Sequence, residues 1–314
     1  MQHSPVVNVE TMRVPLDRHD RSRRILQLSK GSLIHATMHG FINQVDLSPL
    51  RLQRSVARTP ASPAREQVDD MCLLQGFDHT IAILGHGRDE EQISLVSLDH
   101  NRKHISCSLD RPWNRTKKGG VSTVCSMMQP LMFASGGYDH GVHLWTLNED
   151  LSSASPSQLA IKHTSVVQSL VPIRDTSHKL VSASADNNVH IWDLSSERIV
   201  NTVKTSNSVF HAHPTSSPFC ILLELRDYRL VPETPVQRFG YETPRIHGKF
   251  IKGDVQSNEF VCGGRDGCIR LWDMRSYNGP FTTVSRATTM LFKLLSIKPV
   301  VISWWVQQVT TSQG

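Results

Sequence analysis

The chain has 314 residues and a formal net charge of +6. It has no uncharged apolar run of about 20 residues, the length that spans a bilayer. Its most apolar stretch, residues 290–306, includes Lys293, Lys298 and Pro299. No apolar segment follows the N-terminus, so we expect neither a membrane protein nor a secreted one, and we place the chain in the nucleus or the cytoplasm. Six singly scattered cysteines without a C-x-x-C pair fit a reducing compartment.

The positive charge is concentrated near the N-terminus. Residues 11–65 hold ten Arg or Lys against three Asp, a local charge of +7, so the rest of the chain sums to −1. Ser-Pro and Thr-Pro pairs occur at Ser48, Thr59 and Ser62. We therefore expect residues 1–68 to form a basic, largely flexible arm that serves as a linker or regulated tail or binds nucleic acid. No aromatic residues alternate with these arginines, so stacking on bases is not predicted.

Three stretches further along the chain repeat one pattern. They are "SGGYDHGVHLWTL" (135–147), "SASADNNVHIWDL" (182–194) and "GGRDGCIRLWDMRS" (263–276). Each places an Asp six residues before a Trp, as the pairs Asp139 and Trp145, Asp186 and Trp192, and Asp266 and Trp272. Asp followed by Asn, Gly or His-Gly tolerates the positive φ of a tight turn, so each Asp predicts a hairpin between a small-residue strand and a β-branched strand. Both faces of the second strand carry bulky residues, so each sheet has to be covered on both sides.

Two weaker copies extend the pattern into a period. They are "ILGHGRDEEQISLVSLD" (83–99) and "CILLELRDYRLVPET" (220–234). Positions 96, 145, 192, 233 and 272 then mark five copies, separated by 49, 47, 41 and 39 residues. Each period has room for four strands, and the insertions at 110–120 and 148–157 indicate surface loops.

These copies resemble the repeats of the WD-repeat β-propeller family, over residues 69–286. The resemblance implies an all-β fold with about five recognisable four-stranded blades. In the family, a turn Asp, a Ser or Thr in the second strand, a Trp in the third strand and a His at the head of the repeat form a buried hydrogen-bonded set. One copy has candidates for all four positions: His163, Ser182 or Ser184, Asp186 and Trp192.

The copy that ends at Trp145 departs from this pattern. Gly120 stands where the head His would be. A missing His removes one partner of the buried Asp139, so we expect that carboxylate to be satisfied by water or backbone and the blade to be less rigid.

Five blades are fewer than the roughly seven that the family implies. Residues 25–50 and 281–306 could each supply a further blade, but neither has a turn Asp at the required spacing. The atypical C-terminal segment, residues 287–314, either forms closing strands or marks a truncated or altered version of a longer propeller. Its composition favours the second alternative, an incomplete seven-bladed ring.

The sequence contains no G-x-S-x-G, no P-loop, no G-x-G-x-x-G after a strand and no metal-binding frame. We therefore expect no catalytic, cofactor-binding or metal-binding residues, and no enzyme. A propeller presents many loops on a rigid ring, so the predicted function is a non-catalytic scaffold that binds other proteins or peptides.

The segment "WDMR" (272–275) resembles the Trp-Asp-x-Arg box of substrate receptors for cullin-RING ubiquitin ligases. The resemblance implies Asp273 and Arg275 as partner-binding residues, with the guanidinium facing a ligase adaptor. The alternative is an ordinary exposed arginine, in which case Asp273 pairs locally with Arg275 or Arg270.

Overall fold

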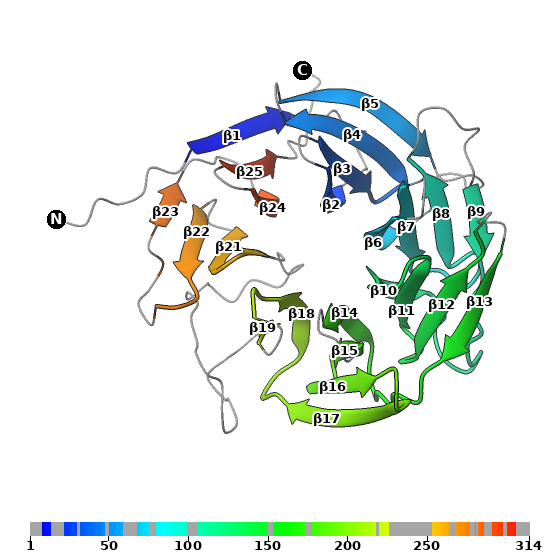
Figure 1. Ribbon diagram of the computed structural model, residues 1–314. Coiled ribbons are helices and arrows are strands. Elements are labelled where there is room, and N and C mark those ends of the chain that lie inside the picture. The colour runs from blue at the N-terminus through cyan, green and yellow to red at the C-terminus, as the bar shows by residue number, and fades with distance from the viewer. Residues whose placement is uncertain are drawn as a thin grey trace, which may run out of the picture.

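The computed structural model describes residues 8–13, 22–29, 32–47, 50–58, 68–75, 80–98, 106–149, 153–173, 178–217, 220–225, 253–263, 268–276, 280, 282–285, 291–297 and 300–305. Every regular element in these ranges is a β-strand (Figure 1). The described residues contain no helix long and apolar enough to cross a membrane.

Five sheets of the described chain have four antiparallel strands each, paired in sequence order. Their strands are β2 (Ser22–Ser29), β3 (Ser32–Thr37), β4 (Phe41–Leu47) and β5 (Leu50–Arg58); β6 (Val68–Gln75), β7 (Thr80–His86), β8 (Ile93–Ser97) and β9 (Ser106–Leu109); β10 (Val121–Ser126), β11 (Met132–Gly137), β12 (Val142–Leu147) and β13 (Ala154–Gln158); β14 (Val167–Ile173), β15 (Lys179–Ser184), β16 (Asn188–Asp193) and β17 (Arg198–Lys204); and β20 (Asp254–Gln256), β21 (Glu259–Gly263), β22 (Cys268–Asp273) and β23 (Thr282–Ser285).

Two smaller sheets complete the described architecture. β18 (Val209–Pro214) pairs with β19 (Ile221–Leu225), and β24 (Leu291–Ile297) pairs with β25 (Val300–Trp305), which also pairs in parallel with β1 (Asn8–Arg13). The innermost strands contact one another in the order β2, β6, β10, β14, β18, β20 and β24, and β24 contacts β2 (Figure 1). The all-β propeller expected from the sequence is confirmed, and the described strands form a closed ring of seven blades.

The two ends of the chain differ from the sequence expectation. Residues expected to form a flexible arm contain the four-stranded blade β2–β5, and the atypical C-terminal segment supplies β24 and β25, which close the ring against β1. The ring is therefore not the incomplete one that the composition of residues 287–314 favoured. A turn Asp marks the blades that are recognisable in the sequence, whereas the β3–β4 turn spans Met38–Gly40 and uses Gly40 at a φ of 80°. Glycine reaches this conformation without a polar side chain, so the blade has no Asp to mark it.

The inner strands share a feature that packs neighbouring blades together. Four of the inner strands begin with a fully buried valine, and the strand register shifts directly after it. The four valines are Val68, Val121, Val167 and Val209. Two of these four valines each fit against a glycine of the preceding blade. A Cβ on Gly85 would lie 2.6 Å from Val121 Cγ1, and one on Gly136 would lie 2.5 Å from Val167 Cγ1. The small residues of the second strand thus leave room for the next blade.

Polar side chains also link successive blades near these valines. Asp70 of β6 accepts hydrogen bonds from the Val124 N–H (3.2 Å) and the Thr123 hydroxyl (2.9 Å) of β10. Ser169 of β14 accepts one from the Ala212 N–H of β18 at 3.1 Å. These contacts satisfy backbone groups at the blade junctions, where water has little access.

Gly136 provides a test of this packing. We expect Gly136→Val to destabilise the protein by about 1–3 kcal/mol, because the added side chain overlaps Val167 of the next blade. The midpoint of urea unfolding measures this. Thr146→Val, at an exposed position of β12, is the control and should change stability by less than about 0.5 kcal/mol. Equal stability of the two variants would contradict close packing at Gly136.

Candidate interaction surface

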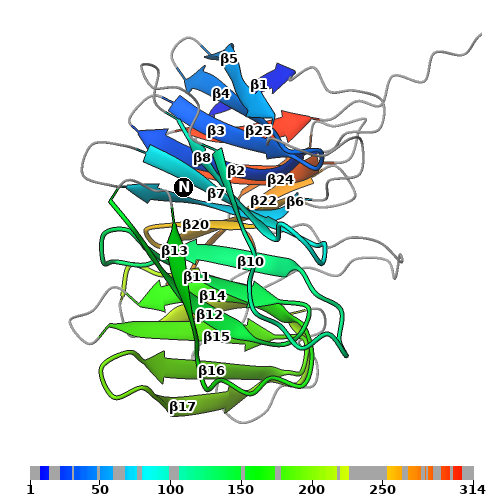
Figure 2. The same ribbon diagram turned by 90° about the vertical axis from the view of Figure 1, so that its right-hand side faces the viewer.

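Antiparallel pairing sorts the connections of the propeller onto two rims. The turns between the second and third strands and the links from one blade to the next lie on one rim, named here the Asp139 rim. The turns between the third and fourth strands lie on the other, named the Asp273 rim. Figure 2 shows the blades from the side, with the strand ends on opposite sides of the ring.

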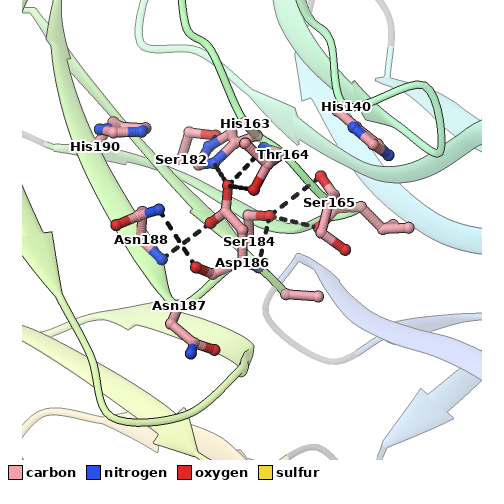
Figure 3. A network of polar contacts seen from close by, with 12 residues as sticks. His140, His163, Thr164, Ser165, Ser182, Ser184, Asp186, Asn187, Asn188 and His190 are labelled. Atoms are coloured by element: carbon pink, nitrogen blue, oxygen red, sulfur yellow. Dashed lines mark hydrogen bonds and ion pairs between the residues drawn. The ribbon is translucent and has the colours of Figure 1, made fainter.

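A buried polar network on the Asp139 rim links the head of one repeat to its hairpin turn (Figure 3). His163 Nδ1 lies 3.1 Å from Asp186 Oδ2, and His163 Nε2 lies 2.9 Å from Ser182 Oγ. A carboxylate only accepts hydrogen bonds, so Nδ1 carries the proton and Nε2 accepts from the Ser182 hydroxyl. Asp186 also accepts from the backbone N–H groups of Thr164 (2.7 Å) and Asn188 (3.0 Å).

The two candidate serines of this repeat have different partners. Ser182 contacts His163, whereas the Ser184 hydroxyl donates to the carbonyl of Val166 at 2.9 Å and accepts from the Asp186 N–H at 3.2 Å. Trp192 is buried in the core, and its indole N–H has no hydrogen-bond partner among the described residues. The network therefore consists of a His, a Ser and an Asp, and Trp192 contributes apolar packing.

Protonation of this network follows from its burial. Burial lowers the pKa of His163, although Asp186 beside it acts in the opposite direction. Burial acts to raise the pKa of Asp186, but the hydrogen bonds from Thr164, Asn188 and His163 outweigh it and lower that pKa. At neutral pH the network thus holds a neutral imidazole against a carboxylate.

In the neighbouring blade, the buried turn Asp is paired with an arginine in place of a histidine. Arg111 Nη2 lies 2.7 Å from Asp139 Oδ1, and the side chains are 0% and 6% exposed. The guanidinium also donates to the carbonyls of Gly120 (3.0 Å) and Gly141 (3.3 Å). Asp139 therefore has a charged partner, and the expectation that it would rely on water or backbone alone is wrong.

Arg111 was missed because it lies in the insertion at 110–120, which has the composition of a surface loop. Gly137 is the residue in the sequence that makes room for Arg111. A Cβ at this position would lie 2.1 Å from Arg111 Nη2. The sequence shows that glycine, but only the fold shows that an arginine from the β9–β10 connection fills the space.

Two other buried histidines, His143 and His86, each lie near an arginine and are neutral at neutral pH. Burial and the nearby Arg111 lower the pKa of His143 to about 4. Burial and Arg88 lower the pKa of His86 to about 3, and His86 Nε2 lies 2.8 Å from Ser94 Oγ. Neither ring nitrogen of His143 has a hydrogen-bond partner in the described part of the chain.

The remaining tryptophans of the sequence pattern are also buried between blades. Trp145 donates its indole N–H to Ser135 Oγ at 2.8 Å and stacks on Phe133, with ring centroids 5.6 Å apart. Trp272 packs against Phe260 at a centroid distance of 5.6 Å. Asp266, the turn Asp of that last repeat, lies outside the described residues.

The Asp273 rim carries the residues of the Trp-Asp-x-Arg segment. Asp273 accepts hydrogen bonds from Arg275 Nε (2.9 Å), Nη2 (2.7 Å) and the Arg275 backbone N–H (2.9 Å). Asp193 occupies the same place in another blade and accepts from Ser195 and Ser196. Both Asp residues thus hold the turn into the fourth strand. The Arg275 side chain is nevertheless 71% exposed, so its outer face reaches solvent.

Within the described ranges, no group of three or more His, Cys, Asp or Glu side chains could hold a metal ion. The turn Asp residues on the Asp139 rim are engaged by His163 and Arg111. Exposed side chains of the two rims remain accessible for binding.

Comparisons with known proteins agree with this architecture. The family model "WD domain, G-beta repeat" matches residues 156–193 and 249–273. Among solved structures, the β-propeller domain of Cps50 (Swd1) from Myceliophteria thermophila has a TM-score of 0.65 at 10% identity, covering 88% of this chain and 92% of that one. The computationally designed Ika8 protein has a TM-score of 0.56 at 14% identity, covering 90% and 80%. The chain is a β-propeller.

The chain is also similar to two kinds of curated protein. The ribosome biogenesis protein WDR12 homolog of Drosophila erecta is 24% identical over 238 residues, covering 64% of this chain and 56% of that protein. Mitochondrial division protein 1 of Kluyveromyces lactis is 28% identical over 200 residues, covering 58% and 24%. The chain thus spans just over half the length of the Drosophila relative. The matched family model shows repeats of the WD type at residues 156–193 and 249–273 of this propeller.

The Arg111 ion pair can be tested by removing one partner. We expect Arg111→Ala to destabilise the protein by about 3–5 kcal/mol, because it leaves the buried Asp139 carboxylate without a counter-charge. Arg111→Ala/Asp139→Asn should recover part of the loss. Urea unfolding measures both, and Arg115→Ala, at an exposed position of the same loop, is the control. Wild-type stability of Arg111→Ala would show that the pair contributes nothing.

The buried histidines predict a dependence of stability on pH. The pKa of His143 is about 4 in the folded protein against an ordinary value of 6.5, so the unfolded chain binds more protons between these values. Stability should therefore fall as the pH drops from 6.5 toward 4, with about 2–3 kcal/mol due to His143 by pH 4.5, at about 1.4 kcal/mol per pKa unit.

Unfolding midpoints of wild type and His143→Asn at several pH values measure that contribution. The variant should lose less stability on acidification than the wild type. The same loss in both proteins would show that His143 does not titrate in this range.

Proposed function

We propose that the chain is a non-catalytic scaffold that binds other proteins through its rims. The observation that supports this most strongly is that buried polar groups on the Asp139 rim are paired with one another within the fold. The buried histidine and aspartates there are engaged in linking turns to blades, as His163 with Asp186 and Arg111 with Asp139. A rigid ring with exposed connections on two rims suits binding, as in other repeat folds that present extended surfaces.

The setting we propose is ribosome biogenesis. The support is similarity at 23–26% identity to the ribosome biogenesis protein WDR12 homologs of several Drosophila species. The nuclear or cytoplasmic location expected from the sequence is compatible with that setting.

Affinity purification of the tagged chain, followed by gradient sedimentation, tests this function. We expect ribosome-assembly proteins to be recovered with it and to sediment with ribosomal precursor particles. Recovery of mitochondrial division proteins in their place would contradict the proposal and favour the second group of relatives. The ring variant Gly136→Val is a useful comparison, since loss of the association there would show that it requires the packed blades.

Ligase docking remains the second reading of the sequence, and none of the similar proteins named above supports it. The structure shows that Asp273 holds the Arg275 guanidinium, which agrees with local pairing. The same purification from Arg275→Ala addresses it: recovery of a ligase adaptor by wild type and not by the variant would favour docking. Binding of nucleic acid by residues 1–68 stays a prediction, to be tested by salt-sensitive binding.

A further inference from the structure

The connection between β9 and β10, residues 110–120, is firmly attached to the Asp139 rim. Arg111 joins the start of the connection to the turn Asp139 and to the Gly120 carbonyl at its end. Asn114 Oδ1 accepts from the Thr116 N–H (3.0 Å) and hydroxyl (2.9 Å). The loop is therefore preorganised, which lowers the entropy lost when a partner binds it.

The same loop carries exposed positive charge. Arg115, Lys117 and Lys118 are exposed on it, and Lys162 is exposed on the next blade connection. These four residues are named here the basic rim. Lys117 Nζ donates to the Asp139 carbonyl at 3.2 Å and lies 3.2 Å from His140 Nδ1, and Lys118 Nζ lies 4.2 Å from the centre of the Tyr138 ring. The two lysines are thus held against the turn of the neighbouring hairpin.

No carboxylate of the described chain forms an ion pair with the basic rim. The acids nearby are engaged elsewhere: Asp139 by Arg111, and Asp186 by His163. Asp110 Oδ1 accepts from the Glu91 N–H at 2.5 Å, and Asp89 Oδ1 from the Gly119 N–H at 2.9 Å. None of the four cations is therefore held in an ion pair with a described carboxylate, which leaves them able to attract an anionic partner.

Two features favour an acidic protein segment over a nucleic acid. The Tyr138 ring is covered by the Lys118 ammonium, and its hydroxyl donates to Asp69 at 2.7 Å, so it offers no free platform for stacking bases. The acidic turn that contains Asp89, Glu90 and Glu91 borders the basic loop through the Asp89–Gly119 contact. It would repel the continuous charge of a phosphate backbone, whereas a protein segment can match both signs.

Trp113 adds an apolar contact within the same loop. It is half-buried, and a Cβ on Gly119 would lie 2.8 Å from its Cε2 atom, so the indole packs against the backbone of the loop at Gly119. A partly exposed Trp on a rigid loop is a residue type that is enriched at protein interfaces.

We propose that the basic rim, with Trp113 beside it, docks an acidic segment of a partner protein. The proposal rests on the scaffold function given above and specifies one surface and one class of ligand for it.

The test compares two charge-matched variants in the full chain. Arg115→Glu/Lys162→Glu reverses two residues of the basic rim, and Arg198→Glu/Lys204→Glu reverses two exposed residues of the outer strand β17. Both change the net charge by the same amount. The probe is a fluorescent peptide of about ten Asp and Glu residues, followed by anisotropy at about 0.15 M salt.

We expect wild type to bind the peptide, the basic-rim variant to bind at least about tenfold more weakly and the β17 variant to bind within about twofold of wild type. Equal weakening of both variants would show attraction by overall charge and overturn the proposal. Absence of peptide binding by wild type would do the same, as would tighter binding of a single-stranded RNA of matched length that is lost in the basic-rim variant.

The outcomes separate this inference from the scaffold function. If the basic-rim variant still recovers every protein that wild type recovers in the affinity purification, the docking surface is wrong and the scaffold function stands. If wild type recovers no ribosome-assembly proteins, the proposed setting fails whatever the peptide result. Unfolding midpoints of both variants should match wild type, since all four substituted side chains are exposed.

Discussion

The structure depends on one constraint: a four-stranded antiparallel sheet with bulky residues on both faces cannot bury them alone. Neighbouring blades cover those faces, and the apolar clusters combine residues of adjacent sheets, such as Ile83 and Leu95 with Phe133 and Trp145. Each blade needs two neighbours, so the arrangement is complete only as a ring. The ring closes where β24 contacts β2 and where the parallel pair of β1 and β25 joins the two ends of the chain.

Close approach of the blades places polar turn residues where water is scarce, and each then needs a partner from the protein. Asp186 meets this need with His163 from the head of its own repeat, and Asp139 meets it with Arg111 from the preceding blade connection. The two solutions differ in their electrostatics. Neutral His163 forms a hydrogen bond that depends on pH, whereas Arg111 stays charged over the whole accessible range.

The ion pair between Arg111 and Asp139 also affects the charge exposed on the Asp139 rim. By binding Asp139, Arg111 fixes the loop that carries Arg115, Lys117 and Lys118, and it pairs with the acid that would otherwise balance those cations. Structural support of the blade and exposed charge on its rim thus arise from one loop. On the opposite rim, Asp273 compensates Arg275 directly, so that arginine carries less unbalanced charge.

The sequence by itself determined the fold class, because the spacing of Asp and Trp and the small residues before each turn are local features of a hairpin. The repeats around His163 and Trp145 were recognisable for that reason. Only the tertiary structure decided the blade count, since β2–β5 and β24–β25 have strands without the marker residues and are defined by pairing. It also decided the partner of Asp139. The contact between Arg111 and that carboxylate joins the β9–β10 connection to a turn 28 positions further along the chain, and no local pattern encodes an interaction that forms only after the connection has packed against that turn.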